Sequence, residues 1–156
     1  MNSDKNDTRG SCTALPQPFE GAVNEQAGTV GPNASGEPAW VKLTFASARR
    51  GDCELRNGVL QLWEDGRARW SCETWTNHTH SGDEWLCWFG FRDARGFLIR
   101  ESDAPNAREI ITPNFKSPRM SDGGPHYPWQ VDFSFPVAWF QRLFSVMKSG
   151  TMWASC

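Results

Sequence analysis

The sequence lacks several features that mark well-known classes of protein. Its 156 residues contain no CxxC pair, no G-x-S-x-G and no glycine-rich phosphate loop after a strand. These absences argue against a zinc ribbon, an α/β-hydrolase and a nucleotide-binding enzyme. No apolar run is long enough to cross a bilayer, and the first residues, MNSDKNDTRGSCTALPQPF, lack the apolar stretch of a leader. We therefore expect no membrane partner.

Positive charge is scarce as well. Lys and Arg together number 16 against 18 Asp and Glu, which gives a formal net charge of −2. The arginines between residues 92 and 108 are interrupted by acidic residues. Phosphate backbones are bound by concentrated basic surfaces, so we expect no nucleic-acid partner.

Cysteine is present in an odd number and without metal-binding spacing. The five residues are Cys12, Cys53, Cys72, Cys87 and Cys156. This pattern favours a cytoplasmic protein with reduced thiols, in which Cys72 and Cys87 are core residues. The alternative is a mature secreted chain whose leader has been removed. In that case Cys53 and Cys156 are expected to form a bridge that joins the two ends of the domain.

Tyrosine occurs once, whereas tryptophan occurs nine times. Rings of this size bury much area each, so the chain can build a substantial core or an aromatic-walled cavity. Residues 1–38 hold few periodic apolar residues and many Gly, Pro, Asn and Ser. We interpret them as a flexible N-terminal segment. Residues 39–156 are then a single β-barrel domain.

Alternation of apolar and polar residues with period two is the dominant signal after residue 38. It predicts strands over residues 40–46, 53–55, 59–63, 68–75, 85–91, 97–100, 108–112, 129–135 and 151–154. Apolar residues recur at helical spacing at Val137, Phe140, Phe144 and Met147, which predicts a helix over residues 137–147. The expected fold is mainly β, a small antiparallel barrel or sandwich of about eight strands with one short C-terminal helix.

Two turn dipeptides are expected to set the pairing of the central strands. Asp65-Gly66 predicts a type I′ turn that pairs Gln61 with Trp70, and Asn57-Gly58 predicts a second hairpin. In this register Val59, Gln61 and Trp63 share a face with Ala68, Trp70 and Cys72.

A polar loop over residues 76–84 separates the two central hairpins, and we expect the rim of a site there. Candidate acid–base residues near it are His80, Asp83, Glu84 and Glu73. Candidate ligand contacts are Trp75 and Trp85, which flank the loop, together with His78, His126 and Tyr127. In this reading the site has no metal and no cofactor.

The same loop admits a metal-dependent alternative. His78 and His80 are one residue apart, so on extended backbone both imidazoles point the same way, and Glu84 follows four residues later. This string resembles the first motif of the cupins, and Gly123-Gly124-Pro125-His126 resembles the second. The resemblance covers about a third of the chain. It implies a divalent metal held by His78, His80, Glu84 and His126.

The leading functional hypothesis is a barrel with an aromatic-lined pocket that binds a small molecule; whether it also acts as an enzyme is left open. The first alternative is a carbohydrate-binding, lectin-like module whose Trp rings stack on sugars. The second is a cupin-like metal-dependent enzyme. A third is a structural or interaction protein with a filled barrel.

Overall fold

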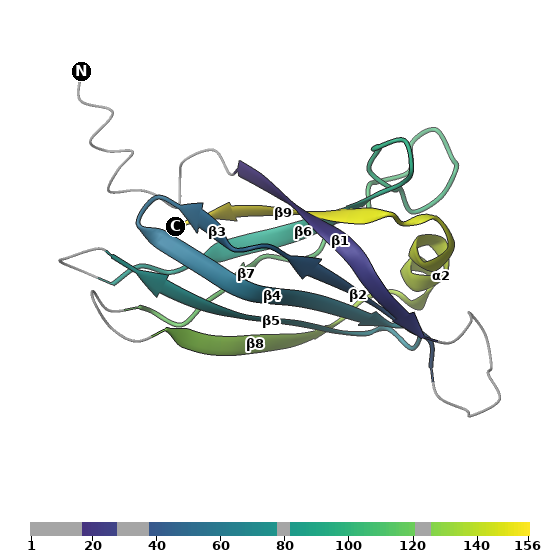
Figure 1. Cartoon of the computed structure of the whole chain (residues 1–156). Helices are drawn as coiled ribbons and strands as arrows, with labels where there is room; N and C mark the ends of the chain where they lie inside the picture. The colour runs from purple at the N-terminus through teal and green to yellow at the C-terminus, as the bar shows by residue number, and fades with distance from the viewer. Residues whose placement is uncertain (1–16, 28–37, 78–81, 121–125) are drawn as a thin grey trace, which may run out of the picture.

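The computed structural model describes residues 17–27, 38–77, 82–120 and 126–156, with backbone alone at 17–18 and 24–27. These residues form a mainly β fold, a nearly closed antiparallel barrel with one short helix, as predicted (Figure 1). The strands are β1 (Gln17–Ala27), β2 (Trp40–Phe45), β3 (Ala48–Arg50), β4 (Cys53–Trp63), β5 (Arg67–Thr76), β6 (Leu86–Arg92), β7 (Phe115–Lys116), β8 (Tyr127–Ser134) and β9 (Ser149–Ser155).

The strands follow the order β7-β6-β9-β1-β2-β4-β5-β8, and β3 also pairs with β4. The two ends of this order, β7 and β8, meet through side chains. The ring centroids of Phe115 on β7 and Phe133 on β8 are 4.7 Å apart. Aromatic packing therefore helps to close the barrel at the seam between its edge strands.

The helix, α2 (Val137–Val146), lies at one end of the barrel, and residue 156 lies at the other (Figure 1). Phe140, Leu143 and Met147 are buried, whereas Val137, which was expected in the apolar stripe, is half exposed. No helix in the described residues is long and apolar enough to span a membrane.

The N-terminal segment corrects one prediction. Residues 17–27 do not form a flexible arm but strand β1, which lies between β9 and β2. Phe19 and Val23 pack against the core from this strand, and between them Gly21 faces the ring of Phe45. With a glycine in place of the middle apolar residue, the strand shows little periodic signal in the sequence. The barrel therefore begins before residue 39.

The interior of the barrel is packed with aromatic rings. Trp70 lies at its centre, with its ring centroid 5.8 Å from Phe45 and 4.7 Å from Phe89. Phe45 and Phe89 also contact each other, with centroids 5.4 Å apart. Trp70 and Phe89 are fully buried, so these rings form a filled core and not the wall of an empty barrel.

The β4–β5 hairpin is confirmed, but its register differs from the prediction by one residue. Leu60 pairs with Trp70, and Leu62 with Ala68. The turn is a three-residue loop in which the amide of Gly66 donates to the carbonyl of Trp63, and Gly66, at φ 93°, is the residue with positive φ. A type I′ turn requires positive φ at Asp65 as well. The one-residue shift turns Leu60 and Leu62 into the core and Gln61 outward.

Asn57-Gly58 is not a hairpin turn, which is a second correction. Strand β4 continues through it, with a β-bulge against β5 between Arg56 and Val59. Asn57 adopts φ 57°, a conformation that Asn tolerates better than most residues. A Cβ on Gly58 would lie 2.6 Å from the Trp70 ring, so this position leaves room for the central ring of the core.

The second central hairpin is confirmed as a turn at residues 93–96, with Arg92 bridged to Leu98. Cys87, Phe89 and Phe91 face the interior as expected. Gly90, where the sequence suggested a bend or space for a ligand, lies under the ring of Trp153, with 2.9 Å between its ideal Cβ position and that ring. Residues 108–112 make isolated bridges, Arg100 to Glu109 and Gly90 to Ile111, and do not form a named strand.

Candidate functional site

The predicted site residues fall into three places in the structure. Glu73 and Trp75 project from β5, His126 and Tyr127 lie at the start of β8, and Asp83, Glu84 and Trp85 precede β6. His78 and His80 lie outside the described residues.

Trp75 and Trp85 do not wall one pocket. Trp85 is fully buried and packs against Phe19, with ring centroids 6.5 Å apart. Residues two positions apart on extended backbone point to the same side, so Trp85 faces inward like Cys87 and is a core residue. Trp75 lies between the buried Thr74 and Thr76 and therefore points to the outer face of β5.

Three of the predicted residues do come together, on the outside of the barrel. The ring of Trp75 lies 4.0 Å, centroid to centroid, from that of His126. The guanidinium of Arg56 lies 5.5 Å from the Trp75 centroid and donates from Nε to Glu73 Oε1 at 3.1 Å. Asn57 Nδ2 donates to Glu73 Oε2 at 3.0 Å. We call Arg56, Asn57, Glu73, Trp75 and His126 the Trp75 cluster.

Electrostatics within the Trp75 cluster fix the state of Glu73. Hydrogen bonds from Asn57 and then Arg56 lower the pKa of this carboxyl below its ordinary 4.5, and the charge of His126 acts in the same direction. The group is therefore ionised at neutral pH. A carboxylate in this state accepts hydrogen bonds and does not supply a proton, which argues against Glu73 as a general acid.

Arg56 and Asn57 were missed by sequence reasoning. Arg56 is the direct cross-strand partner of Glu73, but that pairing depends on the bulge at Asn57, which the sequence suggested was a turn. An Arg facing a Glu across two strands is a signal that becomes readable once the register is known.

A shallow groove of about 380 Å³ adjoins the Trp75 cluster and shares Asn57 and Glu73 with it. The remaining lining residues are Ser71, Cys72, Pro128, Trp129 and Gln130. Ser71, Glu73 and Gln130 alternate with inward residues on β5 and β8, so their side chains lie on the outer face. Polar side chains thus line part of the groove, next to the rings of Trp75 and His126.

Tyr127 faces the other way. It pairs with Thr74 and packs partly against the core, as does Trp129, whose Nε1 donates to Thr74 Oγ1 at 3.0 Å. His126, just before β8, therefore lies in the cluster, whereas Tyr127, the first residue of β8, faces the barrel interior.

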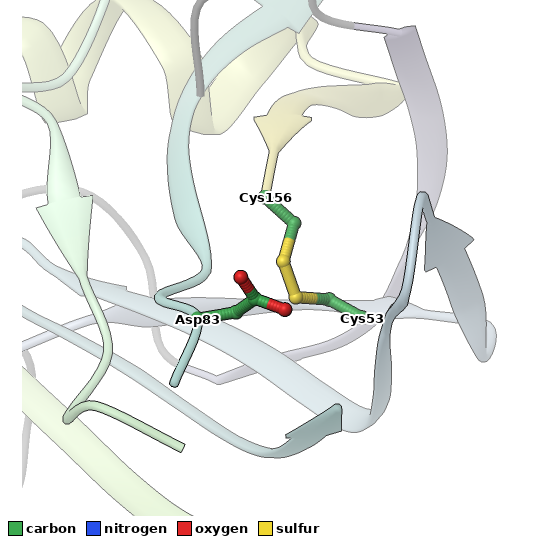
Figure 2. Close-up of side chains that lie close together, drawn as sticks. All are labelled: Cys53, Asp83 and Cys156. Carbon is green, nitrogen blue, oxygen red and sulfur yellow. A yellow bond between two sulfur atoms is a disulfide. The ribbon is translucent and has the colours of Figure 1, made fainter. Parts of the chain in front are cut away.

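A second group lies at the barrel end opposite α2 (Figures 1 and 2). Cys53 and Cys156 form a disulfide with Cα atoms 6.0 Å apart, which confirms the pairing that the sequence offered as an alternative. Cys72 and Cys87 are buried free thiols, as expected. Asp83 points its carboxylate at the two sulfur atoms (Figure 2), and the three side chains place one ligand atom each within 4.8 Å of the others.

Asp83 is held in place from two directions. Its backbone exchanges hydrogen bonds with Met120, at 3.1 Å and 2.8 Å, and Thr76 Oγ1 donates to its Oδ2 at 2.7 Å. Glu84 instead approaches Lys116, with 3.8 Å between Oε1 and Nζ. Glu84 and His126, the described members of the cupin-like set, thus have separate partners.

The chain belongs to a family of unknown function, DUF6294, whose sequence model matches residues 59–156. Neither the curated proteins nor the solved structures provide a significant match.

Proposed function

We propose that the protein binds a saccharide on the outer face of β4, β5 and β8. The observation that carries this proposal is the groove, partly lined by polar side chains, beside the closely packed rings of Trp75 and His126. This is the carbohydrate-binding alternative from the sequence, with the site moved from the loop rim to the strand face.

The groove carries polar groups that a sugar can use. Sugar hydroxyls both donate and accept hydrogen bonds. The lining provides a carboxylate acceptor at Glu73, amides at Asn57 and Gln130, and a hydroxyl at Ser71. Trp75 adds an aromatic ring beside these groups, and small-molecule sites commonly combine aromatic side chains with a few placed polar groups. A volume of about 380 Å³ lies near the lower end for ligand sites and favours one or two sugar rings.

The leading hypothesis of a ligand inside the barrel receives less support. Trp70, Phe45 and Phe89 fill the described interior, so a ligand there would have to displace packed rings. We assign Glu73 a role in binding and not that of a general acid, because its lowered pKa keeps it ionised. For the location, the Cys53–Cys156 disulfide supports the oxidising compartment that was the alternative to the cytoplasm.

The test is a screen of the full chain on an array of neutral and acidic oligosaccharides, followed by titration calorimetry with the strongest binder. Trp75→Ala and Gln130→Ala are each expected to weaken binding at least tenfold. Trp63→Ala is the matched control, because Trp63 also lies half-buried under an arginine, with Arg67 4.8 Å from its ring. It stands at the far end of β4, roughly 20 Å from Asn57 by strand rise.

Thermal unfolding of each variant separates a binding defect from a folding defect. A chain that binds no saccharide on the array overturns the proposal. Equal losses in Trp75→Ala and Trp63→Ala would do the same, since the site would then not lie at the Trp75 cluster.

A further inference from the structure

We infer that the reduced form of the Cys53–Cys156 pair, together with Asp83, forms a site for a thiophilic divalent cation such as Zn²⁺. The two cysteines would then alternate between a disulfide and a metal-bound state. This site is separate from the saccharide groove and does not depend on it.

The three ligands come from three distant parts of the chain that the fold brings together. Cys53 opens β4, Cys156 follows β9, and Asp83 lies in the segment before β6 (Figure 2). Strands β9 and β4 are not neighbours in the sheet, since β1 and β2 lie between them. The cluster thus spans the end of the barrel, and its geometry is set by the fold and not by local turns.

The donor set matches zinc. Two thiolates and a carboxylate with an open fourth position are ligands that Zn²⁺ accepts, at about 2.3 Å for sulfur and about 2.0–2.2 Å for oxygen. A tetrahedron of that size separates neighbouring ligand atoms by roughly 3.5–3.8 Å. The three ligand atoms already lie within 4.8 Å of one another. Once the bond between the sulfurs is cut, rotation about the side chains brings them to the required spacing.

The carboxylate is also oriented as a metal ligand should be. Thr76 is buried, and its hydroxyl donates to Asp83 Oδ2 at 2.7 Å, which fixes the direction of the carboxylate. Such outer hydrogen bonds hold ligands in the geometry that a metal needs. The backbone bonds between Asp83 and Met120 fix the position from which the carboxylate projects.

The exchange is balanced with a dithiol as reductant. The dithiol transfers two electrons to the Cys53–Cys156 bond and becomes a cyclic disulfide, which leaves two thiols on the protein. Zn²⁺ then displaces two protons and forms two Zn–S bonds and one bond to the Asp83 oxygen. In the reverse direction a disulfide oxidant accepts two electrons from the two thiolates, the protein disulfide re-forms, and the ion is released.

The other two cysteines provide an internal control. Burial raises the pKa of the Cys72 and Cys87 thiols, so both stay protonated and are poor metal ligands at neutral pH. Cys72→Ala is therefore expected to leave metal binding unchanged.

The experiment titrates the full chain with Co²⁺, whose thiolate complexes show charge-transfer absorption, and then displaces Co²⁺ with Zn²⁺. Chain kept reduced with a dithiol is expected to bind one Co²⁺ with this absorption, and oxidised chain to bind none at the site. Cys53→Ser should abolish the absorption. Asp83→Asn and Thr76→Val should each weaken binding tenfold or more, the usual effect of losing a ligand or its supporting hydrogen bond.

Alkylation of the wild-type chain keeps the test decisive if Cys53→Ser fails to fold. Bound Zn²⁺ should protect Cys53 and Cys156 from a thiol reagent, as read by mass spectrometry. Reduced chain that binds no Co²⁺, or that gains no protection, overturns the inference. Absorption that survives in Cys53→Ser but is lost in His80→Ala overturns it too, in favour of the histidine-based site.

Discussion

Loss of the Cys53–Cys156 cross-link is expected to destabilise the protein by about 4 kcal/mol. The two residues are 103 positions apart, so the disulfide closes most of the chain into one loop. In the loop-entropy description a closed loop of this length lowers the free energy of folding by about 4.7 kcal/mol at 25 °C, and native disulfides commonly contribute about 2–4 kcal/mol. Both figures are a large part of the stability of a domain of this size, about 5–15 kcal/mol.

The perturbation is the double variant Cys53→Ala with Cys156→Ala, compared with the oxidised parent by urea denaturation. A slope of about 1–3 kcal/mol per molar urea converts 4 kcal/mol into a fall of about 1.3–4 M in the midpoint. Parent chain reduced with a dithiol in the absence of divalent metal serves as the control and should unfold near the same midpoint as the variant.

The native circular dichroism spectrum should not change, because the cross-link acts chiefly on the unfolded chain. A midpoint shift equivalent to less than about 1 kcal/mol refutes the reasoning. It would mean that strands β4 and β9 hold the barrel end together without the disulfide.

Two further predictions address the strand that the sequence did not reveal and the charge of the proposed site. Gly21→Val in β1 should cost about 1–3 kcal/mol in urea unfolding because a Cβ there would lie 2.5 Å from the Phe45 ring; Ala22→Val, at the next and exposed position, should be close to neutral, and equal effects would show that β1 does not pack as described. Glu73, whose pKa is lowered in the folded chain, stabilises the protein above its ordinary pKa of 4.5, and this contribution disappears as the pH falls through the lowered pKa. The melting temperature of the parent should therefore exceed that of Glu73→Gln above about pH 5.5 and converge on it in acid; a constant difference at every pH would exclude the Asn57 and Arg56 hydrogen bonds as its cause.

The strand pattern was predictable wherever one face of a strand is uniformly apolar. Val41, Leu43 and Phe45 on β2, and Cys87, Phe89 and Phe91 on β6, point inward as their alternation indicates. Strand β1 escaped because its inward positions are Phe19, Gly21 and Val23, and glycine breaks the pattern at the place where Phe45 needs space. A close contact between two distant strands dictates that glycine, and it cannot be seen from either strand alone.

Turn chemistry was a weaker guide than alternation. Asp65-Gly66 does form a turn. It is a three-residue loop with Gly66 alone at positive φ, which is also compatible with an Asp-Gly dipeptide but shifts the strand register by one residue. Asn57-Gly58 carries a turn signature because Asn tolerates positive φ, and the fold uses that property for a bulge inside β4. In both places the dipeptide indicates the local backbone conformation, whereas burial of Leu60 and Leu62 decides the pairing.

The sequence identified some residues of the candidate site but not the place where they meet. Glu73, Trp75 and His126 were identified as polar or aromatic residues near the central loop, but their meeting point is the outer face of β5, not the loop. Arg56 completes the cluster through a cross-strand pairing that sequence spacing does not reveal. Trp85 lies next to a polar loop, but it alternates in step with Cys87 and therefore points into the core.

Strand β5 shows how one stretch can serve both the core and the proposed binding surface. Trp70, Cys72 and Thr74 face inward and are buried, whereas Ser71, Glu73 and Trp75 alternate with them on the outside. Truncating the inward Trp70 removes a central ring and is of the kind that costs about 3–5 kcal/mol. Trp75 contacts His126 and Arg56 on the surface, so its side chain is free of that constraint. Two tryptophans five positions apart on one strand therefore differ in place: Trp70 packs in the core, and Trp75 lies on the surface where we propose the saccharide site.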